Sequence, residues 1–265
     1  MDILVHDHHR VLHLVLNRPT KRNALTLQMC KDIINAVRTA ETRNDIGCVL
    51  ISANGSVFCS GMDVAESVPA DELLQVHEQL FTLGAQSLKP LVIAVNGAAL
   101  AGGLGLAAQG HVILASPQAV FGLPELRIGF WPFLVFRSVE AALGRRRTLQ
   151  LALTGHTFDS HTAMGWGLVH QIHDVAEIHH ASLNVAHKLA KSSPLAVAAG
   201  MQYVRDSQGK SLSEAGEIAA KLRAGLVATD DFKEGSAAFQ EKREPRWPSM
   251  PLDFYADGEG PADNS

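Results

Sequence analysis

Apolar residues gather in short runs along roughly the first 120 residues, and amphipathic stretches separate these runs. The runs are rich in Val, Ile and Leu, a composition typical of buried strands. Because strand and helix patterns alternate, we expect repeated β-α units with right-handed crossovers and a largely parallel sheet. The expected strands lie at residues 3–5, 11–16, 48–52, 90–95 and 111–115, and the first two start as a hairpin.

Two long helices are expected between these strands. Thr26 is positioned to cap the first, whose apolar stripe runs to about Arg43. The second is predicted to be continuous over 71–89, and Pro90 then begins the next strand. Residues 54–61 contain Asn-Gly and Ser-Gly pairs and are expected to form a turn and a loop.

From Trp131 onward the pattern is helical, and the one strand expected there is 168–170. The tail after Trp247 is rich in Pro and Gly, so it is expected to be loose. The expected helices are 133–143, 145–154, 160–166, 175–192, 194–208 and 212–228.

The composition is that of a folded protein, with 46% hydrophobic and 19% charged residues among 265. A net charge of -4 gives no general reason to bind nucleic acid or an anionic membrane surface. The three cysteines lack CxxC spacing, and the first residues lack the basic and apolar parts of a signal peptide. A reduced, cytoplasmic location is therefore expected.

Residues 91–108 carry no charge and are nearly long enough to span a membrane. The turn signal Asn96–Gly97 and the glycines that follow it interrupt this stretch. We therefore expect a buried strand, a turn and a buried helix, and no membrane association.

The segment Asn96–Gly105 leaves a predicted strand and enters a helix through small residues. Small side chains let a ligand approach the backbone, and a helix N-terminus presents unpaired N–H groups that suit a developing oxyanion. Tight helix packing explains the same glycines equally well. Residues 103–108 also fit the G-x-G-x-x-A dinucleotide pattern, but Glu125 does not follow the next strand directly, as a ribose-binding acid should.

A second source of backbone donors is the glycine-containing loop Phe58–Asp63. With this loop in place, the chain resembles the crotonase superfamily, the enoyl-CoA hydratase/isomerase family, over about residues 3–247. The motifs that carry the resemblance are Leu16–Pro19 with Asn23–Leu25, Phe58–Asp63, Asn96–Gly103, Phe121–Glu125 with Gly129, Leu153–Gly155 with Gly167–Val169, and Glu234–Arg243.

The resemblance implies an α/β fold, a crotonase-like (ClpP/crotonase) spiral of repeated ββα units with a helical C-terminal region. In these terms residues 1–195 form the core, 196–250 a helical trimerisation region and 251–265 a flexible tail. The implied assembly is a homotrimer or a dimer of trimers.

The resemblance also implies an acyl-CoA thioester as substrate, with no cofactor beyond its CoA moiety. Met62 and Gly102 match the two backbone donors of the family's oxyanion hole, and Glu125 matches a catalytic glutamate. Lys242 matches a basic residue that reaches CoA in a neighbouring subunit. The other positions that match CoA-binding parts are Arg22 (or Lys21), Ala24, Leu25, Ser60, Asp63, Val64 and Ala65.

The sequence departs from the hydratase pattern at one position. Hydratases of the family use two glutamates, and the first of them falls here at Gly105, which has no acid-base group. One carboxylate can move a proton between two carbons, which favours isomerisation of 3-enoyl-CoA to 2-enoyl-CoA. Phe130, Trp131 and Phe133 are expected to form a dry acyl pocket that raises the pKa of Glu125.

Two alternatives stay open. A hydratase could use a substitute acid, for which Asp63, Glu66 and Glu140 are candidates, although Asp63 is better explained as a loop-fixing residue. A catalytically silent relative that binds acyl-CoA or RNA is also compatible with the missing glutamate.

The thirteen histidines do not predict a metal site. No cysteine or acidic partner has ligand spacing, and His6 and His8 share a face only if the first strand continues. The histidines considered were His6, His8, His9 and His13 near the start and His170, His173, His179 and His180 later. The run 145–147 of three arginines has no interleaved aromatic residues, so a solvated or subunit-facing turn is expected there instead of an RNA site.

Overall fold

Two β-sheets form the centre of the fold, which a computed structural model describes over residues 1–67 and 69–255. The larger sheet has the strand order β1-β2-β3-β5-β7-β10, and only the β1–β2 pair is antiparallel. The smaller sheet has the order β4-β6-β8-β9, and only β8–β9 is antiparallel. The strands are β1 (Ile3–His8), β2 (Val11–Leu16), β3 (Cys48–Ala53), β4 (Val57–Cys59), β5 (Leu91–Val95), β6 (Ala98–Leu100), β7 (Val112–Ala115), β8 (Val120–Gly122), β9 (Thr157–Asp159) and β10 (Gln171–Ile172).

Helices cover both faces of the larger sheet, so its central strands are apolar on both sides. One face packs against α1 (Leu27–Thr42) and the smaller sheet in the main hydrophobic core. The other face carries a separate apolar cluster under α8 (Ile178–Ala190). This two-sided burial explains the nearly continuous apolar runs in the sequence.

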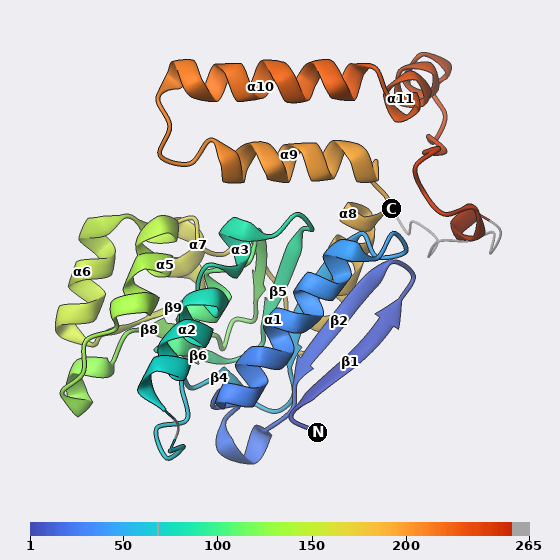
Figure 1. The fold of residues 1–265 in the computed structure, drawn as a ribbon. Helices are drawn as coiled ribbons and strands as arrows, with labels where there is room; N and C mark the ends of the chain where they lie inside the picture. Colours follow the sequence, from blue (N-terminus) through green and yellow to red (C-terminus); the bar gives the residue numbers. More distant parts are fainter. Residues whose placement is uncertain (68, 256–265) are drawn as a thin grey trace.

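The last three long helices form a C-terminal arm over residues 194–241. Within it α9 and α10 are antiparallel, and neither contains a buried residue. Figure 1 shows this pair set above the sheets, with α9 running alongside α3. The remaining helices are α2 (Ala70–Leu80), α3 (Leu83–Gln86), α4 (Gly102–Ala107), α5 (Phe133–Leu143), α6 (Arg145–Thr154), α7 (Ser160–Gly165), α9 (Pro194–Asp206), α10 (Leu212–Val227) and α11 (Asp230–Glu241), with 3-10 turns at Pro19–Lys21, Glu125–Ile128 and Leu252–Tyr255.

The predicted α/β class with a helical C-terminal region is confirmed, as are the bounds of α5 and α6. Thr26 caps α1 as predicted, because its side chain accepts a hydrogen bond from the Met29 N–H. The helix α11 was not among the expected helices. The expectation of a loose tail falls largely on residues 256–265, which lie outside the described residues.

The prediction of one continuous helix over 71–89 is wrong. The Phe81 carbonyl accepts from the Ser138 hydroxyl at 2.7 Å, and the Gly84 N–H donates to the Gln109 side chain at 3.0 Å. Side chains from elsewhere in the fold therefore take the backbone groups that a continuous helix would use. The chain splits into α2 and α3, and Phe81 is buried at the break.

Two predictions about strands are also wrong. The strand expected at 168–170 is not there, because the N–H groups of Leu168 and Val169 both donate to the Ala163 carbonyl. The strand in this region is β10, which pairs in parallel with β7. The whole smaller sheet was missed, part of it in the loop expected at 54–61, because its strands of three residues are too short to show an alternating pattern.

The helices of the described chain include none that is both long and apolar enough to cross a membrane. The uncharged stretch 91–108 divides into β5, β6 and α4. The expectation of a strand, a turn and a helix there is confirmed, with β6 as an additional short strand.

Candidate active site

Three neighbouring parallel strands of the smaller sheet lead to the three residues that the sequence predicts for the site. β4 leads to Met62, β6 leads to Gly102, and β8 leads to Glu125. Because β4 pairs with β6 and β6 with β8, their carboxyl ends lie side by side. The sheet order therefore brings together residues that are 63 positions apart at the extremes.

The Met62 backbone is held from the side of Leu25. The Leu25 N–H donates to the Gly61 carbonyl at 2.8 Å, and the Leu25 carbonyl accepts from the Asp63 N–H at 2.8 Å. These two bonds make a parallel bridge between Leu25 and Met62. In such a bridge the groups on either side of the central residue make the bonds, so the Met62 N–H points away from Leu25. It is directed toward the side on which α4 begins.

The Met62 and Gly102 peptides approach each other closely. A Cβ atom at Gly102 would lie 3.4 Å from the Met62 nitrogen and 3.1 Å from the Met62 sulfur. A Cβ at Gly61 would lie 2.9 Å from the Ala101 Cβ and 3.4 Å from the Gly102 nitrogen, and Gly61 has φ +110°. The positive φ and the close contact at Gly61 require glycine there, and the approach of the two peptides places two backbone donors around one small space.

Ala101 orients the Gly102 N–H. Ala101 has φ 52° and ψ −124°, a strained conformation for a residue with a Cβ, and its own N–H donates to the Gly122 carbonyl at 2.9 Å. Gly102 is the first residue of α4, so its N–H has no partner within the helix. The sequence offered no signal for Ala101, because the strain comes from the joining of β6 to α4.

Glu125 is a buried carboxyl group with an unused oxygen. The residue is 8% exposed, and its Oε2 atom is buried without a hydrogen-bond partner. Burial raises the pKa of Glu125 to about 7. A carboxyl group in this state can both accept and return a proton near neutral pH.

The space beside Gly105 is filled with apolar side chains. A Cβ at Gly105 would lie 2.8 Å from a Phe81 ring carbon and 3.1 Å from a Val135 methyl group. The side chain that hydratases of the family carry at this position therefore has no room here. Phe81 and Val135 could not be linked to the site from the sequence, because they come from the break after α2 and from α5.

The three acids considered as substitutes are each held by other groups. Asp63 accepts from Arg18 at 3.1 Å and from the Ala65 N–H at 3.2 Å, so it fixes the loop, and Arg18 lowers its pKa. Glu66 accepts the Leu27 N–H at 2.7 Å at the start of α1. Glu140, on α5, has a carboxylate oxygen 3.8 Å from the guanidinium of Arg145, the first residue of α6.

The residues that match CoA-binding parts lie together, with one exception. The Ser60 N–H donates to the Arg22 carbonyl at 3.0 Å, so the turn at 22–25 and the segment 60–65 are one surface. Arg22, Val64 and Ala65 are exposed on it, and Leu25 is buried. Lys242 does not join this surface within the chain, because it ends α11 in the C-terminal arm, well apart from β4 and β6 in Figure 1.

The expected aromatic pocket is only partly dry in the single chain. Trp131 packs against the core and stacks on Phe136 at 5.8 Å between ring centres. Phe130 and Phe133 are 56% and 69% exposed and contact each other edge to face. The burial that raises the pKa of Glu125 therefore does not come from an enclosure formed by these three rings.

The dinucleotide interpretation of residues 103–108 does not hold. Gly103 and Gly105 lie inside α4 instead of in a turn before it. A Cβ at Gly103 would lie 2.2 Å from the Cys59 carbonyl oxygen, so this glycine permits close packing of α4 on β4.

Comparisons with known proteins identify the family that the sequence resembles. The sequence profile described as enoyl-CoA hydratase/isomerase matches residues 7–250. The chain is 34% identical over 252 residues to 2,3-dehydroadipyl-CoA hydratase of Escherichia coli (strain K12), covering 92% of this chain and 97% of the relative. It is 30% identical to mevalonyl-coenzyme A hydratase of Aspergillus fumigatus, covering 89% and 91%.

A solved structure shows the same fold. The crystal structure of human enoyl coenzyme A hydratase domain-containing protein 3 superposes with a TM-score of 0.88 at 26% identity. The match covers 93% of this chain and 100% of that one.

Proposed function

The chain belongs to the enoyl-CoA hydratase/isomerase family, and on that premise we propose that it converts 3-enoyl-CoA thioesters to 2-enoyl-CoA thioesters. The observation that carries this proposal is the contrast between two positions, Glu125 and Gly105. Glu125 supplies one buried carboxyl group, whereas Phe81 and Val135 occupy the space beside Gly105 where hydratases carry a second.

The proposed reaction needs one proton carrier and one oxyanion site. The Glu125 carboxylate removes a proton from C2 of the bound thioester, and the electron pair shifts onto the thioester oxygen to give a dienolate. The Met62 and Gly102 N–H groups donate to that oxygen and stabilise its charge. Glu125 then returns the proton to C4, so the double bond moves from C3–C4 to C2–C3 and the atoms balance.

The raised pKa of Glu125 suits this cycle. A pKa of about 7 leaves a useful fraction of carboxylate to take the first proton. The same value makes the protonated group acidic enough to release the proton at C4. No water molecule has to be activated, so a second acid is not required.

Hydration of 2-enoyl-CoA is the second candidate, because the relatives with the printed names above are hydratases. That reaction needs a group to activate water in addition to Glu125. Asp63 and Glu66, the nearest acids in the sequence to the oxyanion loop, are already bonded to Arg18, Ala65 and Leu27.

For the assembly, we propose that subunits associate through the C-terminal arm as a trimer or a dimer of trimers. Large apolar side chains are exposed along the arm, and a gathering of exposed apolar side chains is typical of a protein–protein interface. They include Leu195, Val204, Leu212, Phe232 and Phe239. In such an assembly Lys242 would contact the CoA bound to a neighbouring subunit. Sedimentation velocity of the purified protein tests the number of subunits.

The test of the proposed function is a paired assay of 3-enoyl-CoA isomerisation and 2-enoyl-CoA hydration. Isomerisation that is lost in Glu125→Gln and kept in Glu217→Gln, a change of an exposed acid on α10, supports the proposal. Hydration as the main activity of the wild-type protein would reject isomerisation and show that another group activates water.

A further inference from the structure

A pocket of about 420 Å³ lies on the face of the larger sheet that α8 partly covers. The α8 helix begins at Ile178, so the sheet face beyond that point is left open and forms the hollow. His13 and Ser52 point into it from β2 and β3, on the side opposite the main core. Met62, Gly102 and Glu125 are not among the residues that line this pocket, so it is separate from the candidate active site.

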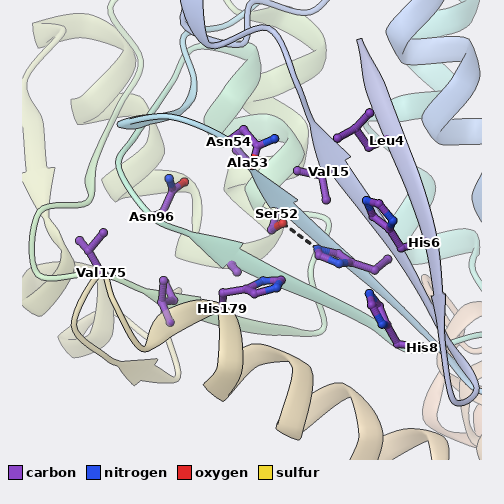
Figure 2. Close-up of a pocket in the computed structure, with 13 residues that line it drawn as sticks. Leu4, His6, His8, Val15, Ser52, Ala53, Asn54, Asn96, Val175 and His179 are labelled. Carbon is purple, nitrogen blue, oxygen red and sulfur yellow. Dashed lines mark hydrogen bonds between the residues drawn. The ribbon is translucent and has the colours of Figure 1, made fainter. Parts of the chain in front are cut away.

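Four histidines gather in this pocket, as Figure 2 shows. The strand β1 continues to His8, so His6 and His8 lie on one face with His13, which pairs with His6 across the hairpin. The ring centres of these three are 5.7–6.0 Å apart. His179, in the first turn of α8, lies 5.1 Å from His13.

Two atoms in the pocket are buried without a partner. His13 is 2% exposed, and its Nε2 bonds the Ser52 hydroxyl at 2.8 Å while its Nδ1 has no partner. The Asn96 side chain donates to the Gly55 carbonyl, which leaves its Oδ1 buried without a donor. An unpaired buried polar atom is costly, so both positions favour a polar ligand.

The charged groups around the pocket favour an anion. The residues that line it include no Asp, Glu, Lys or Arg. Asp7 alternates to the other face of β1 and pairs with Arg43, and Asp174 and Glu177 precede α8 outside the lining. On α8, His180 contacts Asn184, and His187 faces His9 near the other end of the helix. Protonated imidazoles in the pocket would therefore have no carboxylate partner among the residues that line it.

A metal ion fits the observed placement less well. Across residues 1–67 and 69–255, no group of three or more His, Cys, Asp or Glu is arranged to hold one. The four histidines line a hollow of about 420 Å³. A ligand larger than a single ion matches that space.

We propose that this pocket binds a phosphate group, with His6 and His8 taking up protons as it binds. Burial and the neighbouring histidines lower the pKa of His179, so this ring donates an N–H as a neutral imidazole. The imidazolium N–H groups donate to the phosphate oxygens, and His13 stays neutral and donates or accepts according to its tautomer. A hydrogen phosphate also carries an O–H that can donate to Asn96 Oδ1, whereas sulfate has no O–H to donate. Because protonation and binding are linked, affinity rises as the pH falls.

The test is a titration of the full-length protein with inorganic phosphate, followed by the histidine ring signals in NMR and by calorimetry in two buffers of different ionisation enthalpy. We expect proton uptake, and affinity about tenfold tighter at pH 5.5 than at pH 8. His8→Gln should weaken binding by about tenfold, the scale of one charge-assisted hydrogen bond. His161→Gln, an exposed histidine on α7, is the matched control and should leave the affinity unchanged.

Further probes separate the sources of the phosphate and the rival ligand. If CoA displaces phosphate, the pocket binds a phosphate of the substrate. If CoA does not displace phosphate, the pocket binds free phosphate. Either outcome supports the proposal. Binding equal at both pH values, or weakened equally by His8→Gln and His161→Gln, would overturn it. Zn²⁺ that shifts the four ring signals when phosphate does not would make this a metal site instead.

Discussion

Glu125 and His13 are two buried titratable side chains with an unused atom, and they lie on opposite sides of the larger sheet. Burial acts on both in the same way, by disfavouring the charged form. It raises the pKa of Glu125 to about 7 and lowers that of His13 to about 3. The same physical cause therefore produces a group that titrates near neutral pH and one that stays neutral there.

The consequences for chemistry differ accordingly. Glu125 changes its protonation state under ordinary conditions, which a proton carrier requires. His13 does not, so any charge in its pocket must come from the neighbouring histidines. The close-packed apolar side chains beside Gly105 and the open hollow beside His13 add to the contrast.

The largest effect is expected when Glu125 loses its ability to carry a proton. Glu125→Gln keeps the shape of the side chain, and we expect kcat to fall about 10³-fold, within the range for removal of a general acid-base group. Stability above pH 7 should rise, because no buried charge has to form. Enzyme kinetics with a thermal unfolding curve measure both, and an unchanged kcat would contradict the assignment.

The pH dependence of stability should separate the two groups by sign. Because the pKa of His13 is lowered in the fold, the unfolded chain binds a proton below about pH 6.5 and the folded chain does not. The free energy of unfolding therefore falls toward pH 3, by up to about 4 kcal/mol. The raised pKa of Glu125 acts in reverse, and stability falls as the pH rises from about 4.5 to about 7.

Urea unfolding of two variants from pH 4 to pH 8 checks this opposition. His13→Gln should flatten the acid side of the profile, and Glu125→Gln the neutral side. The same flattening in both variants would show that neither buried group controls the profile.

A smaller effect is expected from filling the space beside Gly105. Gly105→Ala would place a methyl group 2.8 Å from Phe81, so we expect a loss of about 1–3 kcal/mol from overpacking. Gly216→Ala in α10 has open space around it and should instead stabilise by about 0.5–1 kcal/mol. Equal effects in chemical denaturation would mean that the apolar packing beside Gly105 is loose.

The smallest effect concerns the strained Ala101. Ala101→Gly removes the cost of its positive φ, so stability should rise by about 1 kcal/mol. The freer backbone should hold the Gly102 N–H less firmly, and we expect kcat to fall severalfold with KM little changed. A rise in stability with no change in kcat would show that the strain does not serve the oxyanion site.

Much of the fold was predictable because its signals are local. The Thr26 cap, the bounds of α5 and α6, and the apolar strands of the larger sheet all follow from spacing and side-chain type. The identity of Met62, Gly102 and Glu125 as candidates followed from the resemblance to a family. Their roles remain predictions that the experiments above test.

The sequence by itself determined which residues favour strands and helices, and that one carboxyl group stands where hydratases have two. Only the tertiary structure decided that β4, β6 and β8 end side by side, that Phe81 fills the space beside Gly105, and that four histidines share a pocket. Strand order, helix breaks and burial depend on contacts between residues far apart in the chain. Such contacts set the solvent exposure of Glu125 and His13, and with it their opposite pKa shifts.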